Sequence, residues 1–258
     1  MILAKDISLG NIDSIRIKLS SQKYQYVETD TKKFRKLLRC FRLACKISNI
    51  AIIEIFIKYQ ERLVRQFLAH LIYNSPNDYN SEVIIRLLEF YPHIDINKIF
   101  PYVLRWACDN DETVLVHFLL DKYPNIHDDP TICFYNACKR NYLDIIQIFV
   151  EKTKIDIHYN NNEILMFLCR HDRVDILEII EDCIDNDKIR ENDDYIFFVA
   201  CLSGRIRVAE FLYKKCPNIN RDRYNTLLDM TTGPINGWLK NHERTTPTKS
   251  SRKVFKSF

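Results

Sequence analysis

Residues 198–214 read FVACLSGRIRVAEFLYK, and the same arrangement occurs three more times earlier in the chain. The other copies are YNACKRNYLDIIQIFVEK (135–152), RWACDNDETVLVHFLLDK (105–122) and RLACKISNIAIIEIFIKY (42–59). Each copy holds an alanine–cysteine pair, a short break and then apolar residues at helical spacing. No residue in the pattern points to chemistry by itself, so its recurrence is the feature that needs an explanation.

The cysteines of this pattern define a period. They are Cys45, Cys108, Cys138, Cys169 and Cys201, of which Cys169 follows a leucine instead of an alanine. The last three intervals are 30, 31 and 32 residues, and the first, of 63, is about two such units. A fixed period of this size is the signature of stacked repeats. The chain is therefore predicted to be an array of short repeats.

The residue three positions after each cysteine predicts a turn. These positions hold Ser48, Asp111, Asn141, Asp172 and Gly204. Glycine, asparagine and aspartate tolerate the left-handed backbone that often ends a helix. Apolar residues follow at i, i+1, i+3 and i+4, as in Ile145, Ile146, Ile148 and Phe149, and this spacing predicts one buried helix face. Each unit is thus expected to be a helix, a tight turn and a second helix.

Weaker units extend the array in both directions. Residues 81–97 look like a second helix followed by a proline phrase, with Ala69 and His70 as the small pair of the same unit. Residues 8–20 look like an opening unit in which Gly10 is the turn residue. We predict one array of about six units over residues 1–240, with the first two divergent. Residues 222–240 are expected to form a C-terminal cap, and 241–258 a basic disordered tail.

The pattern resembles the ankyrin repeat. The copy that ends in CPNIN, ACLSGRIRVAEFLYKKCPNIN, is similar to the family's AAxxGHxxVVxLLLxxGADxN. The resemblance implies an all-α fold, an α-solenoid of stacked helix-turn-helix repeats. The composition, rich in Ile, Asn, Lys and Tyr, is similar to that of divergent ankyrin proteins of large DNA viruses that infect amoebae.

Some positions depart from the family. Its TPLH opening is absent, and Asp129 and Pro130 are expected at the N-cap and first position of an early-starting helix. Almost no loop remains between residues 56–59 and 62–67. We therefore expect the β-hairpin fingers of ankyrin arrays to be short or absent, and a generic helical-hairpin solenoid is the structural alternative.

The sequence gives no sign of an active site or a metal site. It has no phosphate-binding loop and no metalloprotease, hydrolase or kinase motif. His171 and Asp172 look like an acid–base pair, but Asp172 is a turn position of the repeat. The nine cysteines contain no CxxC pair, which predicts reduced thiols in the cytoplasm, with the nucleus as the alternative. No enzyme, cofactor, metal or membrane span is expected.

The ankyrin resemblance implies a protein partner, a host protein if the chain is viral, and we expect the chain itself to be a monomer. Contacts in that family use the inter-repeat turns and the exposed side of the first helices. The candidate partner-binding residues are Asp128, Asp129, Tyr159, Asn160, Arg205, Arg207, Arg221, Arg223 and Tyr224. Arg205 and Arg207 are included because they vary among the copies.

Charge supports a second hypothesis. Residues 1–46 hold 11 basic and 4 acidic residues, or +7, and residues 47–240 hold 22 and 29, or −7. Residues 241–258 hold five basic residues and one acid, or +4. The segment 31–46 alternates basic residues with an apolar stripe, which predicts a helix with a basic face. Binding of nucleic acid or an anionic surface through 31–46 and the tail is the alternative function, although the acidic middle makes nucleic acid an unlikely partner for the whole array.

Overall fold

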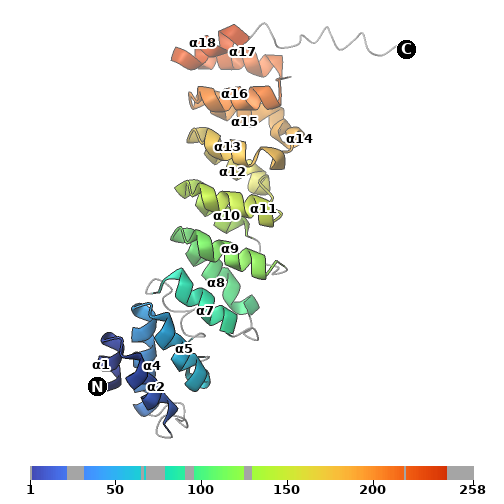
Figure 1. The fold of residues 1–258 in the computed structure, drawn as a ribbon. Helices are drawn as coiled ribbons and strands as arrows, with labels where there is room; N and C mark the ends of the chain where they lie inside the picture. Colours follow the sequence, from blue (N-terminus) through green and yellow to red (C-terminus); the bar gives the residue numbers. More distant parts are fainter. Residues whose placement is uncertain are drawn as a thin grey trace. The chain divides into compact units, whose positions relative to one another are not determined.

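The computed structural model describes residues 2–21, 32–64, 67, 79–90, 96–124, 130–217 and 219–242 (Figure 1). Across these residues the protein is all-helical and contains no strand. The chain divides into two compact units, Met1–Asp128 and Asp129–Phe258, which we call unit 1 and unit 2. Each is described by itself below. The predicted tail lies, except for its first two residues, outside the described part of the chain.

Unit 1 contains two groups of packed helices. Its helices are α1 (Ile2–Ser8), α2 (Ile12–Ser20), α4 (Lys32–Lys46), α5 (Ile50–Tyr59), α7 (Ser81–Phe90), α8 (Ile96–Asp109) and α9 (Thr113–Lys122). Helix α1 contacts α2 and α4, and α5 contacts α2 and α4, so these four form one group. In the other group, α9 contacts both α7 and α8.

Unit 2 consists of helix pairs that repeat along the chain. They are α10 (Thr131–Arg140) with α11 (Leu143–Lys152), α12 (Tyr159–Arg170) with α13 (Val174–Ile179), α15 (Glu191–Leu202) with α16 (Ile206–Lys215), and α17 (Arg221–Met230) with α18 (Gly233–His242). First helices contact first helices, in the order α10, α12, α15, α17. Second helices contact second helices, in the order α11, α13, α16, α18. The pairs therefore pack in register, as helices α10 to α18, yellow-green to red, show in Figure 1.

The predicted turns are confirmed. All five turn residues have a left-handed backbone: φ is 53° at Ser48, 58° at Asp111, 63° at Asn141, 57° at Asp172 and 70° at Gly204. In every turn, the amide that follows this residue donates to the carbonyl just before the repeat cysteine, for example Glu112 N to Ala107 O at 2.9 Å and Arg205 N to Ala200 O at 3.0 Å. This hydrogen bond closes the end of the first helix. Gly10, in the opening unit, is left-handed as well, with φ of 66°.

The predicted core is confirmed too. The five repeat cysteines are completely buried, and no cysteine in the chain forms a disulfide. The apolar stripe of each second helix is buried beside them, as for Ile145, Ile146, Ile148 and Phe149. Small residues on the first helix let the second helix approach closely, and this contact is what the repeated alanine–cysteine pair encodes.

Several details differ from the sequence-based expectations. The described residues contain eight second helices, against about six predicted units, namely α2, α5, α7, α9, α11, α13, α16 and, in the predicted C-terminal cap, α18. Helix α10 begins at Thr131, one residue later than predicted, and Pro130 is its N-cap and not its first residue. Pro130 already has a helical φ, so the difference concerns only the residue at which the helix is counted to begin. Between α13 and α15, a 3₁₀ turn (Glu181–Cys183) and the short helix α14 (Asn186–Ile189) stand where a hairpin finger would lie.

Candidate interaction surface

Three first helices of unit 2, α10, α12 and α15, each expose one stripe of side chains to solvent. In α10 the stripe runs through Ile132, Tyr135 and Lys139, at i, i+3 and i+7; in α12 it includes Glu163 and Phe167, at i and i+4, and in α15 Tyr195 and Leu202, at i and i+7. We define the first-helix face as the stripe residues Ile132, Tyr135, Glu163, Phe167, Tyr195 and Leu202. Ile132, Tyr195 and Leu202 are 52%, 42% and 45% exposed, which is high for large apolar side chains. Because α10, α12 and α15 pack side by side, these side chains form one continuous surface.

A hydrogen-bond network on this face joins α10 to α12. The hydroxyl of Tyr135 donates to Glu163, and Asn160 Nδ2 donates to Glu163 Oε2 at 2.7 Å. Both donors lower the pKa of the Glu163 carboxyl, and Asn160 has the larger effect. Burial, followed by the bond to Glu163, raises the pKa of Tyr135 to about 12. The carboxylate is thus held ionised on a largely apolar face, where it can orient a donor from a partner.

Aromatic contacts continue the same face. The ring of Tyr135 meets that of Phe167 edge-on at 5.9 Å, and Phe167 lies 4.3 Å from the imidazole of His171. Lys139 Nζ sits 4.1 Å from the centroid of the Tyr135 ring, at cation–π distance. The rings of two neighbouring repeats are therefore held in fixed orientations, and a partner would meet a preorganised surface.

The start of α12 has an unusual backbone. Asn160, Asn161 and Asn162 all have positive φ, between 51° and 64°, so they form a left-handed turn ahead of the regular helix. His158 fixes this turn, since its Nδ1 bonds to Asn162 Oδ1 at 2.5 Å and its Nε2 accepts from Asp185 N at 3.0 Å. Because Nε2 accepts, the proton of the neutral imidazole lies on Nδ1. The turn holds Tyr159, 51% exposed, at the end of the first-helix face.

The structure does not gather the predicted partner-binding residues into one cluster. Tyr159 and Asn160 lie at the start of α12, and both are exposed. Arg205 and Arg207 are exposed as well, but they lie around the turn between α15 and α16, beyond the opposite end of the first helices. A first helix of 10 residues is about 15 Å long, so the two groups mark opposite edges of the first-helix face.

The prediction that Tyr224 binds a partner is wrong, and the structure does not fully describe four other predicted residues. Tyr224 is completely buried, and its hydroxyl donates to Leu239 O at 2.7 Å. It therefore packs α17 against α18 and cannot meet a partner. Asp128 and Asp129 lie outside the described residues, and so do the side chains of Arg221 and Arg223, although both belong to α17.

The sequence-based reasoning missed Tyr135, Glu163 and Phe167. Each belongs to the outward stripe that starts six positions before the repeat cysteine, at Ile132, Glu163 and Tyr195. The signal was therefore present, as a second period on the opposite side of the first helix from the buried one.

The residues considered for chemistry have structural roles. Cys169 is completely buried, and burial raises its pKa to about 12, so the reactive thiolate does not form near neutral pH. Asp172 has the left-handed backbone of the repeat turn. In the part of the chain that the structure describes, no three His, Cys, Asp or Glu side chains are placed to hold a metal ion. Nor does any described helix have the length and apolar character needed to cross a membrane.

Comparison with known proteins gives no relatives for this chain. No protein-family model matches it, and neither does any curated protein or solved structure. The ankyrin resemblance therefore rests on the sequence pattern alone.

Proposed function

We propose that this chain is a non-enzymatic protein-interaction scaffold whose helix pairs form an ankyrin-type array. One observation carries the proposal, namely the first-helix face of unit 2. Three successive first helices expose apolar or aromatic side chains there, including Ile132, Tyr195 and Leu202. Large apolar groups gathered on one surface are typical of contact sites for other proteins, in which aromatic residues are enriched.

The packing of unit 2 supports the array interpretation. Corresponding helices of neighbouring pairs contact one another, so each pair buries its core against the next and leaves the same stripe outside. Such an arrangement lengthens an exposed face with every added pair. In the viral setting that the resemblance implies, the partner would be a host protein met in the host cytoplasm.

The proposal is tested by affinity capture with the full chain at physiological salt. The informative variant is Ile132→Ser with Tyr195→Ser, which removes exposed apolar groups from two repeats without touching the core. Truncation of central interface residues weakens binding by about 1–2 kcal/mol each, or about tenfold each. We expect the captured protein to be lost with this variant.

A matched control is available in unit 1. Leu9 and Val114 are each 70% exposed, so Leu9→Ser with Val114→Ser removes apolar groups that are not part of the first-helix face. This control is expected to capture the same protein as the unchanged chain. No reproducible protein at all, or equal loss with both double variants, would contradict the proposal.

A second candidate function is favoured by helix α4. Its 15 residues, KKFRKLLRCFRLACK, include seven cations and no acid. The helix is about 22 Å long, so a cation occurs about every 3 Å along it, close to the phosphate spacing of about 3.4 Å on one DNA strand. This density favours a polyanion such as nucleic acid as the ligand of α4.

Burial of the apolar side of α4 disfavours a membrane. Phe34, Leu37 and Phe41 are only 4%, 2% and 0% exposed, and α4 packs against α1 and α5. A helix that binds a membrane surface inserts its apolar face between the lipids, and here that face is already used by the core. An anionic membrane would therefore meet the charges of α4 alone.

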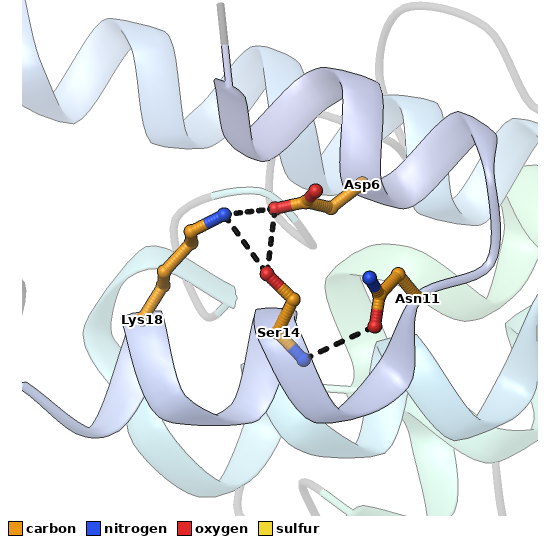
Figure 2. Close-up of polar contacts among 4 residues, drawn as sticks. All are labelled: Asp6, Asn11, Ser14 and Lys18. Carbon is orange, nitrogen blue, oxygen red and sulfur yellow. Dashed lines mark hydrogen bonds and ion pairs between the residues drawn. The ribbon is translucent and has the colours of Figure 1, made fainter.

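The one acid of the neighbouring helix α1, Asp6, does not pair with the cations of α4. Asp6 is bonded by Lys18 Nζ of α2, and Ser14 Oγ of α2 donates to the same carboxylate oxygen at 3.1 Å (Figure 2). Lys18 in turn contacts Ser14, while Asn11 caps the start of α2. Asp6 is thus committed to α2 and does not pair with the cations of α4.

Salt dependence tests the second function. We expect a labelled DNA duplex or single-stranded RNA to bind at low salt, with log K falling steeply as log salt rises. In Lys36→Gln with Arg39→Gln, the slope should become shallower by about one per phosphate contact removed. Lys58→Gln with Arg62→Gln, on the same unit, is the control with equal charge change. Binding that ignores salt, or that both double variants weaken equally, would exclude α4 as the site.

A further inference from the structure

The edge of unit 2 that carries the inter-helix turns is lined with cations. We define the cationic turn edge as Lys139, Arg140, Arg170, Arg173, Arg205 and Arg207, two from each of three consecutive helix pairs. All are exposed except Arg173, which is half-buried. Three acids lie among them, Asp144, Asp172 and Asp175, so the edge carries six positive and three negative charges.

Helix stability explains only part of this charge, because Lys139, Arg140 and Arg170 lie in the last turns of α10 and α12, where the helix dipole favours cations. Acids stabilise the first turn of a helix and cations oppose its dipole there. Asp144 and Asp175 follow that rule in α11 and α13, six positions after their repeat cysteines. At the same position of α16 the chain has Arg207, and Arg205 stands at the N-cap. Two arginines thus oppose the dipole of α16, and a role outside the helix accounts for them.

Arg205 is held on the edge by a hydrogen bond between repeats. Arg205 Nε donates to Arg170 O at 3.0 Å, which ties the α15–α16 turn to the end of α12. Arg173, next along the same edge, has a buried Nε for which no acceptor lies among the described residues. The α15–α16 turn is therefore tied to the neighbouring repeat, and Arg173 presents a buried donor on the same edge.

We propose that the cationic turn edge binds an acidic segment of a protein partner, in an extended polyproline-like conformation with an acidic side chain at every third residue. Packed helices lie about 8–10 Å apart. A polyproline II chain rises about 3.1 Å per residue with three residues per turn, so every third side chain points the same way about 9 Å along. One acid then meets each pair of cations. This inference rests on the proposed scaffold function and specifies the chemistry of its partner.

A nucleic acid fits this edge less well. Its phosphates follow one another every few ångströms, so a strand along the edge would bring phosphates against Asp144, Asp172 and Asp175 as well as against the cations. Discrete acids at repeat spacing can pair with the cations and leave those aspartates facing uncharged residues. The edge thus differs from α4, which carries no acid at all.

The test uses the full chain and two labelled peptides. One consists of Glu-Pro-Ala repeats, and the other has the same composition with its glutamates placed in adjacent groups. We expect the periodic peptide to bind about fivefold more tightly than its isomer. Arg205→Gln with Arg207→Gln should weaken the periodic peptide by about fivefold to tenfold, the combined effect of two exposed charge pairs. Lys214→Gln with Lys240→Gln, exposed residues of α16 and α18, is the charge-matched control and should change nothing.

The outcomes separate this inference from the scaffold function. Equal binding of the two peptides, equal weakening by the control variant, or tighter binding of a DNA duplex through Arg205 and Arg207 would each overturn the inference. If the peptides fail but capture of a protein still depends on Ile132 and Tyr195, the scaffold stands and only the acidic-segment partner is wrong. If that capture fails as well, the scaffold function falls with it.

Discussion

The α8–α9 turn of unit 1 and the α15–α16 turn of unit 2 share one backbone and carry opposite charge. Asp111 and Gly204 are both left-handed, and the same hydrogen bond closes both helix ends. The first turn nevertheless holds Asp109, Asp111 and Glu112, whereas the second holds Arg205 and Arg207. The small-residue pair and the left-handed position determine the backbone, and the remaining turn positions are free to set the surface. Fold and surface charge are therefore encoded by different residues of the same repeat.

The largest expected effect concerns the core, in which the two units are alike. Phe56 packs on Phe41 in unit 1, with ring centroids 5.2 Å apart, and Phe149 packs on Phe134 at the equivalent position of unit 2, at 6.0 Å. Both Phe56 and Phe149 are completely buried. Phe56→Ala and Phe149→Ala should each lower the free energy of unfolding by about 3–5 kcal/mol.

The two tryptophans can report this effect unit by unit. Trp106 belongs to unit 1 and Trp238 to unit 2, and the chain has no other. Urea unfolding followed by fluorescence in Trp238→Phe and Trp106→Phe backgrounds reads each unit separately. We expect each phenylalanine variant to shift the transition of its own unit most. A cost below about 1 kcal/mol in either unit would show that its core is not packed as described.

A smaller effect is expected at the turn glycines, one in each unit. Gly10 and Gly204 have φ of 66° and 70°, with no atom near where a Cβ would stand. Gly204→Ala and Gly10→Ala should each cost about 1–2 kcal/mol through backbone strain alone. Gly237, exposed within α18 and without a positive φ, is the control: Gly237→Ala should stabilise by about 0.5–1 kcal/mol in thermal unfolding. A loss of stability at Gly237 equal to that at Gly204 would contradict the strain argument.

The buried phenylalanines and the turn glycines could be predicted from the sequence. The period of the cysteines was enough to locate the turns and the buried stripes, because both depend on residues within one repeat. The network of Tyr135, Asn160 and Glu163 joins two repeats, and its geometry depends on how α10 lies on α12, which no local pattern specifies. Tyr224 failed for a related reason: RDRYNT looks like an exposed polar segment, and only the position of Leu239 O reveals a buried partner for the hydroxyl.

The variant Arg207→Asp tests the comparison of the acidic α8–α9 turn with the basic α15–α16 turn. It gives α16 the first-turn acid that α11 and α13 already have, so it should stabilise the chain by about 0.3–1 kcal/mol at low salt. The same change places a negative charge on the cationic turn edge and, like the double glutamine variant, lowers its charge by two, so it should weaken binding of the periodic acidic peptide by about fivefold to tenfold. Thermal unfolding and peptide anisotropy on one sample measure both effects. Lower stability would mean that Arg207 supports the fold, and the argument from the helix dipole would be wrong.

The smallest effect distinguishes two carboxylates, one in each unit. The hydrogen bond from Lys18 is the largest cause that lowers the pKa of Asp6, whereas the uncharged donors Asn160 and Tyr135 lower the pKa of Glu163. In both cases the folded pKa lies below the unfolded value, near 3.8 for Asp6 and 4.5 for Glu163. Each carboxylate therefore stabilises the fold above that value and loses its contribution as the pH falls through the folded pKa. Salt screens an ion pair more than a hydrogen bond from a neutral donor. In NMR titrations, added salt should therefore raise the pKa of Asp6 more than that of Glu163. An equal rise at both carboxylates would show that charge, and not the amide of Asn160, holds Glu163 ionised.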